Sequence, residues 1–120
     1  MSPQFNKGVI EMCILALVYE RDHYGYELVD SISKNLPISE GTVYPILRRL
    51  IQEGSCETYL KESPSGPPRK YYRMTKAGKI KTEELLGQWA EFVENVNLVL
   101  KIKTKKNKRG KSNDEATVSQ

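Results

Sequence analysis

The sequence is poor in the side chains that most enzymes use for chemistry. It contains one histidine, His23, and two cysteines, Cys13 and Cys56, whose spacing fits no metal-binding motif. It also lacks a grouping of nucleophile, base and acid, and it has no glycine-rich phosphate loop. We therefore expect no enzyme, no metal site and no cofactor. Both cysteines are interpreted as reduced, buried thiols, and the alternative for Cys13 is a redox sensor.

Long hydrophobic runs are lacking as well. No stretch approaches the roughly 18 apolar residues that suggest a membrane span. The N-terminus does not have the basic-then-apolar layout of a signal peptide. These features predict a cytoplasmic protein without a membrane partner. A length of 120 residues suits about one domain with a modest core.

The sequence does have an uneven distribution of charge. Residues 1–40 hold three basic and six acidic side chains, which gives −3, and residues 82–100 hold four acids and no base. Residues 41–81 hold nine basic and three acidic side chains, which gives +6. The middle of the chain is therefore where a polyanionic partner would bind. A further basic run at residues 101–111 is interpreted as a solvated tail, and the alternative is a source of nonspecific attraction to phosphates.

Hydrophobic periodicity predicts a mainly α fold with one small β-hairpin. The first helix covers about residues 7–20, and ten of the eleven residues from 9 to 19 are apolar, with Glu11 the exception. Such a helix needs cover on more than one side, which hints at a dimer. A turn at residues 21–23 and a second helix follow, and that helix ends at the Leu36-Pro37 pair.

The third helix is expected to begin after Ser39 as its N-cap and to stop at Gly54. Pro45 falls near the helix start, where proline is best tolerated. Alternation at residues 55–61 and a polar run at 69–74 predict two strands, joined by a tip rich in proline and glycine at 63–68. Helix, glycine stop and hairpin in this order fit a winged helix-turn-helix, which reads duplex DNA.

A long fourth helix is expected over residues 76–103, capped by Thr75. Its apolar residues repeat at spacings of four and three, which suits packing against another helix. At about 1.5 Å per residue the helix would be roughly 40 Å long, so an identical helix of a second copy is the simplest cover. The expected organisation is a winged domain at 1–75, a dimerisation helix at 76–103 and a disordered tail at 104–120.

Candidate functional residues form two groups. The residues placed at DNA lie on the third helix and the hairpin tip: Ser39, Thr42, Tyr44, Arg48, Arg49, Ser65, Gly66, Arg69 and Lys70. The residues placed at a dimer interface, or lining an effector pocket within it, are Val9, Met12, Cys13, Leu85, Trp89, Phe92, Val93 and Val96. The alternatives are an ordinary solvated helix face, a plain basic turn, and a Trp89 that only packs in a filled interface.

Three segments resemble the PadR family of bacterial transcriptional regulators: residues 24–28 (YGYEL), 41–50 (GTVYPILRRL) and 66–75 (GPPRKYYRMT). The resemblance covers roughly residues 5–100, and the single C-terminal helix resembles the short subfamily. It implies a homodimeric repressor on a palindromic operator, released by small aromatic or hydrophobic compounds. Ser55-Cys56 departs from the family, which usually has bulkier aliphatic residues there.

The leading hypothesis is a sequence-specific DNA-binding regulator whose partners are double-stranded DNA and a second copy of itself. The alternative is a winged-helix module that binds proteins and has no specific DNA site. Operator binding that survives competitor DNA and weakens with salt would separate the two hypotheses.

Overall fold

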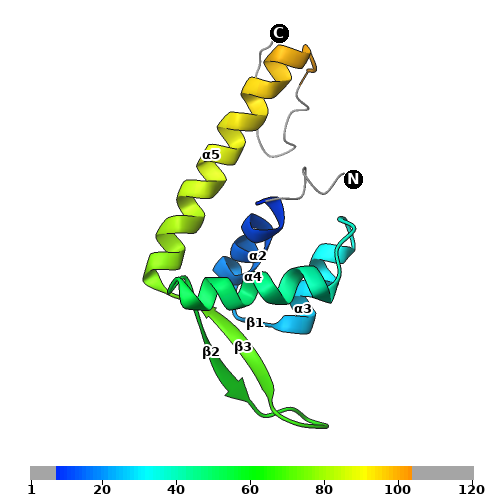
Figure 1. The fold of residues 1–120 in the computed structure, drawn as a ribbon, viewed down its shortest axis with the longest axis vertical. Coiled ribbons are helices and arrows are strands. Elements are labelled where there is room, and N and C mark those ends of the chain that lie inside the picture. Colours follow the sequence, from blue (N-terminus) through cyan, green and yellow to red (C-terminus); the bar gives the residue numbers. More distant parts are fainter. Residues whose placement is uncertain (1–7, 104–120) are drawn as a thin grey trace. The chain divides into compact units, whose positions relative to one another are not determined.

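A computed structural model describes residues 8–103 of the chain. The elements are, in order, α2 (Val9–Glu20), β1 (His23–Tyr24), α3 (Gly25–Ser33), α4 (Glu40–Gln52), β2 (Cys56–Lys61), β3 (Arg69–Met74) and α5 (Lys76–Leu100) (Figure 1). The predicted fold class, mainly helical with a small hairpin, is confirmed. The tail at 104–120 and the expected helix start at residue 7 lie outside the described residues. None of the helices between residues 8 and 103 combines the length and apolar character needed to cross a membrane.

The chain divides into two compact units. The first ends at Leu85 and holds α2, α3, α4, the sheet and the first part of α5, and the second begins at Leu86. The first turns of α5 belong to the first unit, because Gly78 and Thr82 are buried and Leu85 packs against its core.

The core of the first unit lies between its three short helices and the base of the hairpin. Each helix contributes an apolar stripe, and the side chains that are almost fully buried include Ile14 and Leu15 on α2, Leu28 on α3, and Leu47 and Leu50 on α4. Burying one such side chain stabilises the fold by roughly 1.5–3 kcal/mol. The helices are thereby fixed against one another, and α4 keeps one side free for solvent.

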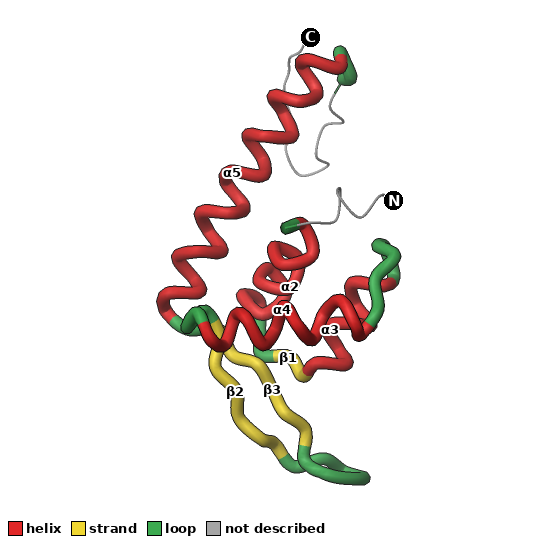
Figure 2. Tube along the Cα trace, viewed as in Figure 1, coloured by secondary structure: helices red, strands yellow, loops and turns green. Residues whose placement is uncertain are grey.

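The sheet has three antiparallel strands in the order β1-β3-β2 (Figure 2). β1 pairs His23 with Tyr72 and Tyr24 with Tyr71. The prediction of a turn at residues 21–23 was wrong for His23, which lies in β1, is 2% exposed, and has its Nδ1 atom 2.9 Å from the carbonyl oxygen of Arg21. A two-residue strand is too short to produce an alternating pattern.

Strands β2 and β3 form the hairpin, which extends away from α2, α3 and α4 (Figure 1). Cys56 and Tyr72, at its base, are buried, whereas Leu60 near the tip is 70% exposed. Only the base therefore belongs to the core. At the tip Gly66 has a φ of 94°, a conformation that glycine adopts without strain.

The helix ends follow the sequence signals closely. Ser39 occupies the N-cap position of α4, although its side chain makes no capping hydrogen bond. Gly54 follows α4 with a φ of 82°, as expected for a glycine stop. Thr75 precedes α5, and its Oγ1 atom accepts a hydrogen bond from the Gly78 N–H at 3.0 Å. The predicted caps thus locate α4 and the start of α5.

Candidate nucleic-acid interface

Helix α4 presents a polar side to solvent because its apolar residues are gathered on the other side. Val43, Leu47 and Leu50 are fully buried, whereas Thr42 and Arg48 are exposed. The Arg48 guanidinium forms no ion pair with any residue in the described range. An exposed arginine without an acidic partner is free to bind an external anion such as phosphate.

Tyr44, one of the residues placed at DNA, lies at the edge of the buried stripe of α4. Its side chain is half-buried and packs over Gly25 of α3, where an added Cβ atom would lie 2.6 Å from the Tyr44 ring. Successive helix residues are about 100° apart, so residue 44 flanks the buried stripe that includes Val43. Burial, together with the Glu40 charge, raises the pKa of the Tyr44 hydroxyl.

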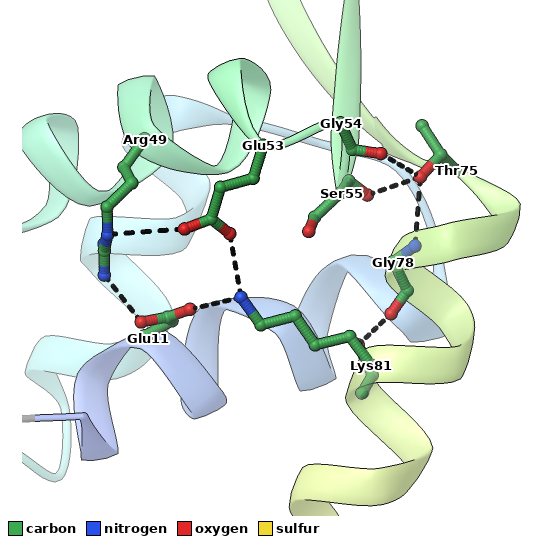
Figure 3. A network of polar contacts seen from close by, with 9 residues as sticks. Glu11, Arg49, Glu53, Gly54, Ser55, Thr75, Gly78 and Lys81 are labelled. Atoms are coloured by element: carbon green, nitrogen blue, oxygen red, sulfur yellow. Dashed lines mark hydrogen bonds and ion pairs between the residues drawn. The ribbon is translucent and has the colours of Figure 1, made fainter.

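Arg49 is partnered differently from its neighbour. Its Nη2 atom lies 2.6 Å from Glu11 Oε1, and its Nε atom lies 3.7 Å from Glu53 Oε2. The Nζ atom of Lys81 lies 2.9 Å from Glu11 Oε2 and 2.8 Å from Glu53 Oε1 (Figure 3). Glu11, Arg49, Glu53 and Lys81 therefore form a closed set of alternating charges, which we call the ion-pair cycle.

The ion-pair cycle affects the ionisation of its members. Burial by itself raises the pKa of Glu11, but hydrogen bonds and charges from Lys81 and Arg49 outweigh it, and the pKa of Glu11 is lowered. Burial by itself lowers the pKa of Lys81, but Glu53 and Glu11 outweigh it, and that pKa is raised. The charged forms of Glu11 and Lys81 are thereby favoured. The one sequence signal for this cluster is Glu11, a single acid within an apolar helix.

A row of three tyrosines crosses one face of the sheet. Tyr24, Tyr71 and Tyr59 are cross-strand neighbours, and the ring centroids are 5.5 Å apart for the first pair and 5.7 Å for the second. The Tyr59 hydroxyl donates to Asp22 Oδ2 at 2.6 Å. This tyrosine row (Tyr24, Tyr71, Tyr59) ties the hairpin to the segment that leads into α3. Predicting the row from the sequence would require the pairing of β1 with β3, and β1 was not predicted.

The two basic residues at the start of β3 face opposite sides of the sheet. The Arg69 guanidinium lies 4.5 Å from the centroid of the Tyr24 ring, so Arg69 belongs to the face of the tyrosine row. Lys70 pairs opposite Leu60 and shares its face with Tyr72, two residues along the strand. The Arg48 charge also acts on Tyr72: burial, the largest effect, raises the pKa of Tyr72, and Arg48 opposes it.

The geometry therefore groups the candidate DNA residues unequally. Arg48 and Lys70 lie toward the sheet face that carries Tyr72, and neither has an ion pair in the described part of the chain. Ser65 and Gly66 are exposed at the tip, and Ser39 and Thr42 are exposed at the start of α4. The other three candidates are less available for DNA. The Arg69 guanidinium lies over the Tyr24 ring, Arg49 forms an ion pair with Glu11, and Tyr44 is half-buried.

The residues expected at a dimer interface are divided between the two units. In the first unit, Met12 is buried, Val9 and Cys13 are half-buried, and Leu85 packs against the core. In the second unit, Val93 and Val96 are half-buried, and Trp89 and Phe92 are 41% and 60% exposed with ring centroids 6.3 Å apart. Burial raises the pKa of the Cys13 thiol, which disfavours the thiolate that a redox sensor needs.

Comparison with known proteins agrees with this geometry. Residues 14–84, more than half of the chain, match the model of the "Transcriptional regulator PadR-like family". A PadR-like transcriptional regulator from Bacillus cereus has 40% sequence identity and a TM-score of 0.75, with 81% of this chain and 96% of that chain covered. An uncharacterised protein of Lysinibacillus sphaericus is 37% identical over 98 residues, which are 78% of this chain and 90% of that protein.

A more distant structure shares the fold. Bacillus subtilis PadR, solved in complex with operator DNA, is 22% identical and has a TM-score of 0.59. The similarity covers 65% of this chain and 46% of that one.

Proposed function

The chain belongs to the PadR-like family of transcriptional regulators, and we propose that it binds operator DNA through α4 and the β2–β3 hairpin. The observation that carries the proposal is that two exposed basic residues, Arg48 on α4 and Lys70 opposite Leu60 near the hairpin tip, form no ion pair within the described range. A solved PadR bound to operator DNA, which shares the fold, supports the same use of the chain.

In the proposed complex α4 enters the major groove. The exposed residues of its first turns, Ser39 and Thr42, approach base edges or the flanking phosphates, and Arg48 contacts a phosphate or a base further along. The hairpin lies over the neighbouring backbone, where Lys70 attracts phosphate. Gly66 lets the main chain of the tip come close to the DNA.

The test is a fluorescence-anisotropy titration of the full chain onto the promoter region upstream of its own gene, with unrelated competitor DNA, over a series of salt concentrations. We expect operator binding to survive competitor and to weaken with salt. Arg48→Gln should make the slope of log K against log salt less steep by about 0.9, the value for one phosphate contact. Lys34→Gln is the matched control, because Lys34 is also exposed but lies at the end of α3 and pairs with Asp30.

The contrary result would be equally clear. If the protein binds the promoter no more tightly than competitor, and if selection from genomic fragments yields no preferred site, specific DNA binding is ruled out. The protein would then be better described as a winged-helix module that binds other proteins.

We further propose that the regulator is a homodimer on a palindromic operator and that it represses by occluding the promoter. The support is the set of exposed apolar side chains on the part of α5 that lies in the second unit: Leu86, Trp89, Phe92, Leu98, Val99 and Leu100. A long helix with so many exposed apolar residues needs a cover, and an identical helix provides one. Two copies of α4 would then reach half-sites about 34–36 Å apart.

A small aromatic or hydrophobic effector is proposed to bind between the two copies near Trp89. Such a ligand releases the operator only if it prefers a dimer shape that does not fit the half-site spacing. The experiment is to add aromatic compounds to the operator complex while following both Trp89 fluorescence and DNA anisotropy. A compound that changes both signals with the same midpoint supports the proposal, and a fluorescence change without DNA release contradicts it.

A further inference from the structure

The ion-pair cycle joins three helices of the first unit. Glu11 comes from α2, Arg49 lies in the last turn of α4 with Glu53 directly after it, and Lys81 comes from the second turn of α5. The three short contacts within the cycle measure 2.6, 2.8 and 2.9 Å. Figure 3 shows Glu11 and Glu53 each placed between the same two cations. Recognition helix α4 is thus held by charge on the side facing α2 and α5.

Arg48 and Arg49 point in different directions, about 100° apart around the helix axis. Arg48 has no acidic partner in the described range, whereas Arg49 contacts two acids. The Glu11 side chain is only 17% exposed, so it would lose its nearest counter-charge in a poorly solvated place if Arg49 turned toward DNA. Removing one partner is unfavourable, because Glu11 would keep only Lys81, at 2.9 Å, as its counter-charge. Arg49 is therefore held back from external phosphates.

Backbone contacts reinforce the cycle at its edge. The Thr75 hydroxyl donates to the Gly54 carbonyl oxygen at 2.6 Å, and the Thr75 N–H donates to the Ser55 carbonyl oxygen at 3.1 Å. The end of α4 is thereby fastened to the start of α5 (Figure 3). The core side chains Val43, Leu47 and Leu50 hold one side of α4 against α2 and α3. The cycle adds polar attachments from the end of α4 to α5 and α2, which refine the orientation that the core sets.

We propose that Arg49 is a positioning residue and not a DNA contact: with Glu11, Glu53 and Lys81 it sets the angle at which α4 meets the operator. The inference rests on the proposed DNA binding. Nonspecific attraction to phosphate does not depend on that angle, but contacts to base edges do. Lys81 consequently affects operator discrimination although it lies on α5 and not on the DNA-facing helix.

The experiment compares Arg48→Gln, Arg49→Gln and Lys81→Met for binding to the operator and to unrelated DNA over a salt series. Arg48→Gln should reduce the salt slope by about 0.9. Arg49→Gln and Lys81→Met should leave the slope unchanged and should lower the ratio of operator to unrelated affinity by roughly 2- to 30-fold. Lys81→Arg should retain the ratio. Lys79→Met is the control for charge loss on α5, since Lys79 lies over the Tyr19 ring and not in the cycle.

The proposal is overturned if Arg49→Gln lowers the salt slope as Arg48→Gln does while Lys81→Met changes nothing. Urea unfolding of the Arg49→Gln and Lys81→Met single and double variants keeps a folding defect apart from a DNA effect. The double variant should lose less free energy of unfolding than the sum of the losses in the two single variants, because both residues belong to one network. Additive losses would contradict the ion-pair cycle. If the unchanged protein shows no operator preference at all, the proposed function fails. The urea unfolding of the single and double variants then still tests whether the four charges join the helices.

Discussion

Gly78, in the first turn of α5, lies where the backbone of Ser55 leaves no room for a side chain. Its Cα faces the backbone of Ser55, and an added Cβ atom would collide with the carbonyl oxygen of that residue. The colliding group is main chain and cannot rotate away. The close approach lets α5 begin directly against the end of α4, where Thr75 makes its hydrogen bonds.

We predict that Gly78→Ala destabilises the protein by about 1–3 kcal/mol, the usual cost of overpacking. This loss should exceed the gain of up to about 1 kcal/mol that alanine gives in a helix interior. Gly41→Ala is the matched control, because a Cβ atom there makes only an ordinary contact, 3.6 Å from Ser39 Oγ. Urea unfolding followed by circular dichroism measures both variants, and equal stabilities for the two would show that Ser55 gives way.

A second prediction at this scale concerns acid. The pKa of Glu11 in the folded state is lowered, so its contribution to stability is present above its unfolded pKa, near 4.5, and is lost as pH falls through the folded value. Glu11→Gln should therefore be less stable than the unchanged protein at pH 7, and the difference should shrink on acidification. Glu84→Gln, at an exposed position outside the cycle, should show no such convergence in unfolding experiments between pH 7 and pH 3.

At the scale of elements, the tyrosine row is the feature that holds the hairpin in place. Tyr71 stands between Tyr24 and Tyr59, and Lys61 lies 5.2 Å from its ring centroid. Aromatic pairs and cation–π contacts of this kind contribute about 0.5–1.5 kcal/mol each. The row thus gives a thin, solvated hairpin the rigidity that it cannot obtain from a core of its own.

We expect Tyr71→Leu to lower the free energy of unfolding by about 1–2 kcal/mol and to weaken operator binding, because the hairpin loses its preferred orientation. Tyr26→Leu is the control, since Tyr26 is 58% exposed and lies outside the row. Hydrogen exchange of the β2 and β3 amides would locate the effect. Unchanged protection of these amides in Tyr71→Leu would show that the strand pairing alone orients the hairpin.

The elements that could be predicted from the sequence are those with signals close together in the chain. Ser39, Gly54 and Thr75 mark the ends of α4 and the start of α5 because caps act over a few residues. β1 was missed since its partner lies on β3, and the pairing leaves no local pattern.

Side-chain roles were harder to predict than helix limits. Tyr44 lies at the edge of a stripe, where periodicity does not distinguish buried from exposed. The separation of Arg48 from Arg49 depends on Glu11, which is 38 residues away from Arg49 in the chain. Neighbouring arginines look equivalent in a sequence, and only the packing of α2 against α4 makes them different.

At the scale of the whole molecule, the two units differ in how much apolar surface each buries within itself. The first has its own core of buried side chains, whereas the helical second unit leaves Phe92 60% exposed and Trp89 41% exposed. A helix alone has no core, so its stability depends on what it packs against. Assembly with a second copy would satisfy this requirement.

Phe92→Glu should therefore convert the proposed dimer to a monomer, because a charge would be buried without a partner at the centre of the interface. Sedimentation velocity measures the change, and Glu91→Gln, one residue away and exposed, is the control. The monomer should bind operator DNA much more weakly, since the two half-sites no longer act together. A Phe92→Glu protein that still sediments as a dimer would place the interface elsewhere.

The closed form of the ion-pair cycle restricts how these four residues can be replaced during evolution. Each acid serves two cations and each cation serves two acids, so a change at any one position leaves two neighbours unbalanced. Each single replacement then passes through a variant with a weakened cycle. Among homologues of this regulator, positions 11, 49, 53 and 81 should therefore vary together or remain as they are, although they are scattered along the chain.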